Sequence, residues 1–143
     1  MVVSKTLTVG GGSAGFLEAG RGRPLVLIHG AAGRGTIWSP QLAGLEAVAR
    51  VLAIDLPGHG ATGGGGDSIR DYAAWVMTFL DAAGLARVVL GGHSMGGAIA
   101  QTIALAHPDR LDGLVLIGTG ARLRVLSRIL ELCRMDPSGA RRL

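Results

Sequence analysis

The residue whose surroundings most favour chemistry is a serine enclosed by glycines, in the stretch Gly92-His93-Ser94-Met95-Gly96. The apolar run Val88-Val89-Leu90 precedes it and a run typical of a buried helix follows, so Ser94 is predicted to lie at a strand-to-helix turn. Such a turn strains the serine backbone and needs residues without side chains two positions before and after it, where Gly92 and Gly96 stand. The pattern indicates a nucleophile for acyl transfer; the alternative is a glycine-rich turn that merely joins a strand to a helix.

Acyl transfer by a serine needs a base that takes its proton and donors that hold the negative oxygen. In a turn of this kind the backbone N–H of Met95 supplies one donor, and a loop after the strand that ends at His29-Gly30 supplies the other. Because only backbone N–H groups are used, the side chains at these positions can be small and apolar. The sequence therefore predicts an oxyanion site but leaves the base to be found.

No histidine is well placed to be that base. His107 is the only histidine after Ser94, and a helix from Ser94 would carry it about 20 Å away at a rise of about 1.5 Å per residue. His93 adjoins Ser94, but neighbouring side chains leave a strand on opposite faces, so His93 is expected to pack beside the turn. His29 and His59 lie at carboxyl ends of strands, where ligands bind in such sheets, and a direct role as base is disfavoured for both.

The carboxylates do not complete a triad either. The strand-to-helix serine turn resembles sites in which the acid and the histidine follow the serine in the chain. The candidates after Ser94 enter a strand at the wrong edge of the sheet or lie in the tail: Asp109, Asp112, Glu131 and Asp136. Asp55 lies at the carboxyl end of a strand but precedes Ser94.

The elements that would position these residues alternate between strand and helix. Strands are expected at 5–9, 16–19, 24–30, 50–55, 88–90 and 111–117, and helices at 37–49, 69–83 and 98–106. A four-residue turn at 10–13 is expected to join the first two strands into a hairpin at the edge of the sheet. This order predicts an α/β protein with a mostly parallel sheet and helices on both faces.

Composition narrows the function classes. The chain has 143 residues, of which 48% are hydrophobic and 17% charged, which suits one soluble domain. Aromatic residues make up 3% of the chain and no nucleic-acid motif accompanies the net charge of +4, so nucleic-acid binding is not expected. Cys133 is the only cysteine, which excludes an internal disulfide, and no metal pattern or cofactor is expected. No apolar run suits a signal peptide or a membrane span, so we expect a cytoplasmic protein.

Taken together, the sequence resembles the amino-terminal half of an α/β-hydrolase fold enzyme. Three motifs carry the resemblance in order: His29-Gly30, Asp55-Leu56-Pro57-Gly58-His59-Gly60 and Gly92-His93-Ser94-Met95-Gly96-Gly97. It extends from about Phe16 to the carboxyl terminus. The resemblance implies hydrolysis of an ester, thioester or lactone of a small molecule, in the serine esterase, lactonase or haloperoxidase-like branch. Ser94 argues against the dehalogenase branch, which has an aspartate there.

The resemblance also assigns roles around Ser94. It points to Ala31 as the second backbone donor of the oxyanion site, beside Met95. It makes His29 and His59 structural supports of the loops around the site, and Asp55 the aspartate that forms a turn. The remaining supports are Gly30, Gly92, His93 and Gly96.

Family members continue with a cap and further strands, whose loops bring the acid and the histidine. We therefore expect a truncated fold, with 1–120 forming the core and 121–143 the start of a cap or a disordered tail. Apolar residues from Leu126 to Cys133 have helical spacing, which suits a first cap helix, a membrane-surface helix or a solvated end. Activity is expected to be impaired without the acid and base; the alternative is a non-catalytic binding module that pairs with another chain. The strand Leu111 to Ile117 would then be an edge open to self-association.

Overall fold

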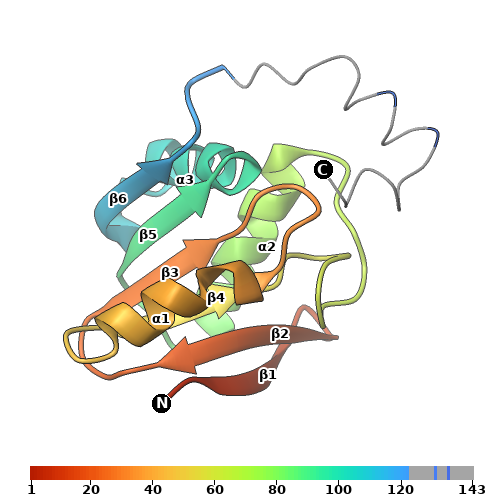
Figure 1. Ribbon diagram of the computed structural model, residues 1–143. Coiled ribbons are helices and arrows are strands. Elements are labelled where there is room, and N and C mark those ends of the chain that lie inside the picture. Colours follow the sequence, from red (N-terminus) through yellow and green to blue (C-terminus); the bar gives the residue numbers. More distant parts are fainter. Residues whose placement is uncertain (123–130, 132–134, 136–143) are drawn as a thin grey trace.

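The fold is built on a six-stranded sheet, shown in Figure 1. The structure is a computed structural model that describes residues 1–122, 131 and 135. The elements in chain order are β1 (Val3–Val9), β2 (Gly12–Ala19), β3 (Pro24–Ile28), η1 (Gly35–Trp38), α1 (Ser39–Leu45), β4 (Arg50–Ile54), α2 (Ile69–Ala82), β5 (Val88–His93), α3 (Met95–Ala106), η2 (Pro108–Arg110) and β6 (Leu111–Ile117).

Most of this sheet is parallel. Its strand order is β1-β2-β4-β3-β5-β6. Strands β4, β3, β5 and β6 run parallel to one another, and β2 joins β4 in the antiparallel direction as the second strand of the β1–β2 hairpin. Because parallel strands end at the same edge of a sheet, the loops after β3, β4 and β5 meet there.

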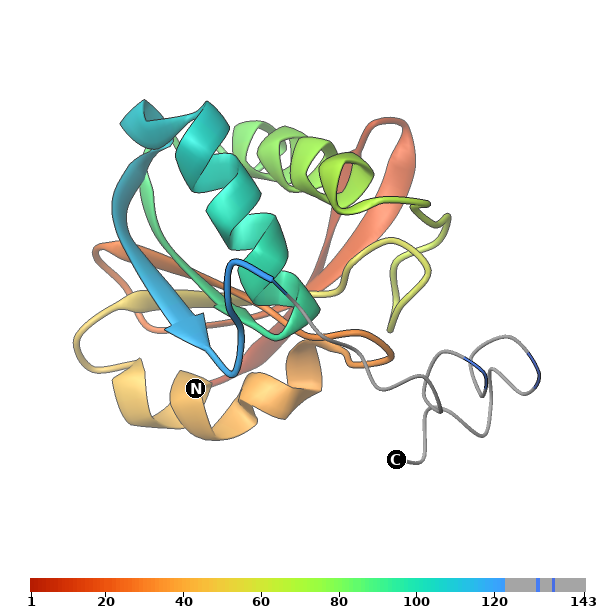
Figure 2. The same cartoon turned by 90° about the horizontal axis from the view of Figure 1, so that it is seen from above.

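Helices cover both faces of the sheet, with α1 on one side and α2 and α3 on the other (Figure 2). The larger core lies between the sheet and α2 and α3, and its fully buried residues include Ile28, Leu52, Ile54, Phe79, Leu80, Leu90, Ile99 and Ile103. The smaller core lies under α1 and contains Leu27, Trp38, Leu42, Val51 and Ala53. The prediction of a mostly parallel sheet with helices on both faces is confirmed.

Helix α2 shows how local sequence sets an element's bounds. Ser68 caps its start, because the Ser68 hydroxyl accepts a hydrogen bond from the Asp71 backbone N–H at 3.2 Å. Its apolar residues recur every three or four positions and face the core, where Phe79 meets Phe16 edge-on at 5.4 Å between ring centroids. Gly84, at φ +67°, follows its end.

Two expected elements differ from the structure. The β1–β2 hairpin has a two-residue turn rather than a four-residue one, because Val9 pairs directly with Gly12. Gly10 and Gly11 both have positive φ, as tight hairpin turns of this kind require. The helix expected at 37–49 is also shorter: a 3₁₀ turn opens the segment, α1 ends at Leu45, and 46–49 form a turn into β4, in which the N–H groups of Val48 and Ala49 both donate to the Leu45 carbonyl oxygen.

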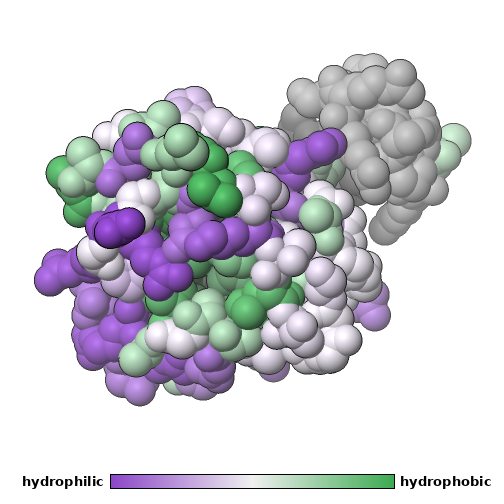
Figure 3. Space-filling model, turned by 90° about the horizontal axis from the view of Figure 1, so that it is seen from below, coloured by the Kyte–Doolittle hydropathy of each residue, from purple (hydrophilic) through white to green (hydrophobic). Residues whose placement is uncertain are grey.

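The two edges of the sheet differ in polarity. β1 exposes Ser4, Lys5 and Thr6, and the view from below, onto this side of the molecule, shows hydrophilic side chains among small hydrophobic patches (Figure 3). β6 instead exposes four consecutive apolar residues by 39–44% each: Leu114, Val115, Leu116 and Ile117. The β1 edge therefore carries polar groups that discourage strand pairing, whereas the β6 edge has only Asp112, near its start, as a charged residue.

The helices of the described part of the chain include none that is long and apolar enough to span a membrane. The amphipathic helix expected between Leu126 and Cys133 lies almost entirely outside the described residues.

Candidate active site

Ser94 lies in the turn between β5 and α3, at the edge of the sheet where the parallel strands end. Its backbone has φ 52° and ψ −116°, and among the described residues Ala32 is the only other non-glycine residue with positive φ. A serine rarely adopts this conformation, because its Cβ crowds the neighbouring peptide groups. The side chain is half-buried and belongs to the N-terminal cap position of α3.

The glycines on either side of Ser94 are required by close backbone contacts. A Cβ at Gly92 would lie 2.2 Å from the carbonyl oxygen of Gly96. A Cβ at Gly96 would lie 2.4 Å from the carbonyl oxygen of Ile28, in the neighbouring strand β3. Any side chain at these positions would therefore push α3 away from the sheet and move Ser94 with it.

The loop after β3 packs against this turn. A Cβ at Gly30 would lie 3.2 Å from the Ser94 Cβ and 3.1 Å from the His93 Nδ1. The His93 ring extends toward the segment after β6, because a Cβ at Gly118 would lie 3.3 Å from its Nε2. His93 is exposed and lies between the two loops, so it packs beside the turn as the sequence predicts.

The two expected oxyanion donors adjoin Ser94 and the loop that packs against it. Met95 begins α3, so its N–H has no partner within the helix. Ala31 follows Gly30 in the loop after β3. Across the part of the chain that the structure describes, neither N–H donates a hydrogen bond outside the helices and strands.

His29 is fully buried and both of its ring nitrogens are occupied. Nδ1 donates to the carbonyl oxygen of Gly30 at 2.7 Å, and Nε2 accepts from the backbone N–H of Leu56 at 3.1 Å. This pattern fixes the neutral ring with the proton on Nδ1. Burial lowers the pKa of His29 because it penalises the charged ring, and the nearby His59 acts in the same direction. The ring therefore ties the loop after β3 to the loop after β4.

Asp55 makes a second tie between these loops. Its Oδ1 accepts from the Gly35 N–H at 2.6 Å, and its Oδ2 accepts from the Ala61 N–H at 2.8 Å. Gly60 must lack a side chain, because a Cβ there would lie 2.1 Å from the same carboxylate. His59 completes the loop: its Nδ1 donates to the Pro57 carbonyl oxygen at 2.9 Å, and its ring lies 4.9 Å from the His29 ring, centroid to centroid.

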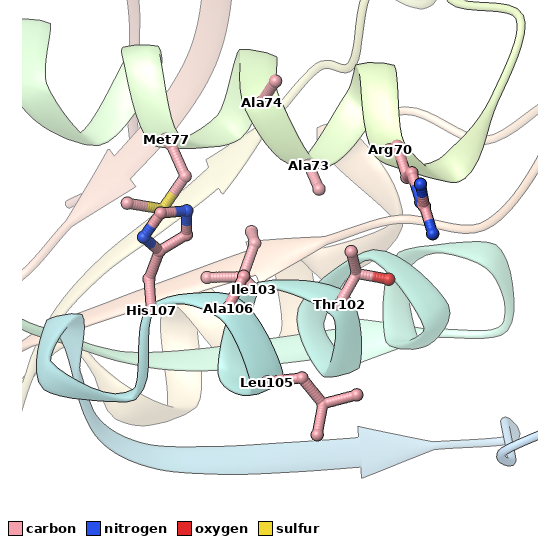
Figure 4. A pocket seen from close by; sticks show the side chains of 9 residues that line it. All are labelled: Arg70, Ala73, Ala74, Met77, Thr102, Ile103, Leu105, Ala106 and His107. Atoms are coloured by element: carbon pink, nitrogen blue, oxygen red, sulfur yellow. The ribbon is translucent and has the colours of Figure 1, made fainter.

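His107 stands at the other end of α3 from Ser94, directly after Ala106. The twelve residues of α3, at about 1.5 Å each, separate the two by about 18 Å. His107 and Met77 extend into a groove of about 720 Å³ between α2 and α3 (Figure 4). The α3 residues that line this groove belong to its second half, Thr102 onward, so the groove is separate from the Ser94 turn.

Two of the remaining acidic candidates, Asp109 and Asp112, lie at the end of β6 opposite to the segment that contacts Ser94, and no hydrogen bond or ion pair links Glu131 to Ser94 among the described residues. Asp109 lies in η2 and Asp112 near the start of β6, where Asp112 pairs with Arg87 at 2.7 Å. Asp136 lies outside the described residues. Within residues 1–122, 131 and 135, no three His, Cys, Asp or Glu side chains gather in a group that could hold a metal ion.

The sequence interpretation missed the role of Thr119, just after β6. The Thr119 hydroxyl donates to the Ser94 carbonyl oxygen at 2.9 Å. Gly118-Thr119-Gly120 is visible in the sequence only as a turn after a strand, and nothing local shows that it returns to residues 25 positions earlier. That contact depends on the pairing of β6 with β5.

Comparison with known proteins gives consistent results. The sequence profile of the α/β hydrolase fold family matches residues 23–136. The (E)-2-((N-methylformamido)methylene)succinate hydrolase of Acinetobacter baylyi is 33% identical over 119 residues, which cover 81% of this chain and 45% of that protein.

Solved structures agree with the sequence matches. A thermophilic esterase superposes with a TM-score of 0.81 at 37% identity, over 98% of this chain and 54% of that one. The enol-lactonase of Burkholderia xenovorans LB400 superposes with a TM-score of 0.85 at 26% identity, over 95% of this chain and 56% of that one. The chain thus spans about half the length of these proteins.

Proposed function

This chain belongs to the α/β hydrolase fold family, and from that membership we propose that it is a serine hydrolase acting through an acyl-enzyme on Ser94. Its substrate is an ester, thioester or lactone of a small molecule. The relatives include an esterase, an enol-lactonase and an (E)-2-((N-methylformamido)methylene)succinate hydrolase, which supports acyl chemistry. The observation that carries the proposal is the strained Ser94 backbone at the start of α3, with close-packed glycines on both sides.

The proposed reaction is acyl transfer through the Ser94 hydroxyl. The Ser94 Oγ attacks the substrate carbonyl carbon while a base removes the hydroxyl proton, and the carbonyl oxygen becomes negative. The N–H groups of Ala31 and Met95 bind that oxygen, helped by the positive end of α3. Collapse of the intermediate expels the alcohol or thiol, which takes the proton, and leaves an acyl-serine. Water then attacks the acyl carbon, the bond from this carbon to the Ser94 Oγ breaks, and Oγ receives a proton from the water as the acid leaves.

We propose that the 143-residue chain performs this reaction weakly, because no histidine of the described residues is placed as the base. His29 uses both ring nitrogens in hydrogen bonds. His107 lies at the far end of α3, His59 is bound to the loop after β4, and His93 packs between two loops. In other serine hydrolases that lack the triad, the oxyanion donors and substrate binding still accelerate hydrolysis roughly a thousandfold over the reaction in water.

The test is hydrolysis of a p-nitrophenyl ester. We expect slow turnover by the chain alone, its loss in Ser94→Ala, and no effect of Ser13→Ala, which changes an exposed serine in β2. Adding the carboxyl-terminal half of a homologous hydrolase should raise the rate by supplying the acid and the histidine. Turnover that survives Ser94→Ala would remove Ser94 from the mechanism. Fast turnover by the chain alone that depends on Ser94 would show that a base is present after all.

The second candidate is a non-catalytic module that pairs with another chain, and the β6 edge favours it. The Ile117 carbonyl oxygen accepts from the Ser94 N–H, so it points toward β5. Because N–H and C=O directions alternate along a strand, the backbone groups of Leu114 and Leu116 point outward, beside exposed apolar side chains. We propose that this edge mediates self-association.

The single cysteine also supports our proposal of a cytoplasmic protein, and the low aromatic content supports the absence of nucleic-acid partners.

A further inference from the structure

We propose that Thr119 is a positioning residue that aligns the Met95 N–H with the developing oxyanion by holding the Ser94 carbonyl group. The structural part of this proposal stands on the contacts around Ser94, and its catalytic consequence rests on the proposed function.

Both backbone polar groups of Ser94 are bound by the segment at the end of β6. The Ser94 N–H donates to the Ile117 carbonyl oxygen at 3.0 Å. The Ser94 carbonyl oxygen accepts from the Thr119 hydroxyl at 2.9 Å. Non-glycine residues keep a positive φ only where surrounding contacts over-determine it. These two bonds from one segment hold the strained Ser94 backbone from outside its own turn.

Thr119 also packs directly on the first turn of α3. A Cβ at Gly97 would lie 2.3 Å from the Thr119 Cγ2 and 2.7 Å from its Cβ. Gly97 is therefore a glycine because Thr119 occupies the space beside it. The segment after Thr119 is held in turn by Gln101, whose side-chain amide reaches the carbonyl oxygens of Gly97 at 3.2 Å and Gly120 at 3.4 Å. The threonine thus has a fixed position relative to α3.

The hydrogen bond to Ser94 acts on the oxyanion donor through the peptide plane. The Ser94 C=O and the Met95 N–H belong to one planar trans peptide unit and point in opposite directions. Fixing the direction of the carbonyl group therefore fixes the direction of the N–H. The N–H groups of Gly97 and Ala98 also donate to this carbonyl oxygen, at 3.0 and 3.2 Å. These two N–H groups belong to α3 and move with it. Thr119 follows β6, so its hydroxyl fixes the peptide unit relative to the sheet.

The experiment compares Thr119→Val, which keeps the shape and removes the hydroxyl, with Thr119→Ser, which keeps the hydroxyl. Thr102→Val is the matched control, because the Thr102 hydroxyl donates at 2.9 Å to the Ala98 carbonyl oxygen of the same helix. Amide NMR follows the Met95 resonance and the hydrogen exchange of the Ser94 N–H. The rate of labelling of Ser94 by a fluorophosphonate probe follows its reactivity.

We expect Thr119→Val to shift the Met95 amide resonance, to speed exchange of the Ser94 N–H about fivefold, and to slow labelling five- to tenfold. Thr119→Ser should stay near wild type, and Thr102→Val should leave both the Met95 amide and the labelling rate unchanged. If Thr119→Val does not fold, Thr119→Ala replaces it with the same expectations. An unchanged Met95 amide in a folded hydroxyl-free variant overturns the proposal, whatever its labelling rate. If wild-type Ser94 is not labelled at all but the Met95 amide shifts only in the hydroxyl-free variant, the positioning role stands and the nucleophile proposal fails.

Discussion

Replacing Asp55 with alanine should destabilise the chain by about 3 kcal/mol, because this carboxylate bonds two loops at once. A hydrogen bond to a charged group contributes about 1.5–3 kcal/mol. The bond to the Gly35 N–H, at 2.6 Å, involves a buried residue and should carry about 2 kcal/mol of this loss. The bond to the Ala61 N–H, at 2.8 Å, ends on an exposed residue and should contribute about 1 kcal/mol, since water can replace it.

The assay is urea unfolding at pH 7 and 25 °C, followed by circular dichroism. Asp112→Ala is the matched control: Asp112 pairs with Arg87 at 2.7 Å, both side chains are substantially exposed, and such pairs are worth about 0–1 kcal/mol. If Asp55→Ala lowers the free energy of unfolding by less than about 1 kcal/mol, or by no more than Asp112→Ala does, the Asp55 carboxylate does not stabilise the two loops as described.

Three further predictions address pH, backbone shape and association. Lowering the pH from 7.5 to 5.5 should lower the urea midpoint of unfolding, because burial lowers the pKa of His29 in the folded chain. Below the ordinary value of 6.5, His29 of the unfolded chain binds a proton while His29 of the folded chain stays neutral, which favours unfolding. The variant His29→Gln should show a smaller fall of the midpoint over this pH range. Gly20→Ala should cost at least about 2 kcal/mol more than Gly22→Ala, because both have positive φ but only the Cβ at Gly20 meets a backbone oxygen, at 2.0 Å; equal urea midpoints would contradict this. Light scattering should show dimers or larger species that Leu116→Lys disperses and Thr6→Lys, on the polar β1 edge, does not; a wild-type monomer at high concentration would count against the β6 interface.

The sequence predicted the elements whose signals are local. Continuous apolar runs located β3, β4 and β6, and the spacing of Trp75, Val76, Phe79 and Leu80 located α2. Both kinds of pattern arise because buried positions carry apolar side chains, which can be read directly from the sequence. The turn at Ser94 was also predictable, because the glycines around it are needed by contacts within the turn and with the next strand.

What the sequence could not show depends on the pairing of distant segments. Asp55 was identified only as a residue that forms a turn, but it also bonds Gly35, twenty positions earlier, because β3 and β4 are neighbours. Thr119 reaches Ser94 for the same reason, through β5 and β6. The shortness of α1 was missed because 46–49 include good helix formers and give no stop signal, whereas in the fold the carbonyl oxygens of Glu46 and Ala49 pack closely against Gly20.

The most direct test of the central proposal is the site at which a fluorophosphonate forms its covalent bond. The chain and its Ser94→Ala variant are incubated with the probe, digested and mapped by mass spectrometry. We predict slow labelling of the wild-type chain, located on Ser94, and none of the variant, because the strained turn and the proposed donors Ala31 and Met95 would favour attack by this hydroxyl even without a base. Labelling at another residue, with Ser94 untouched, would contradict the account.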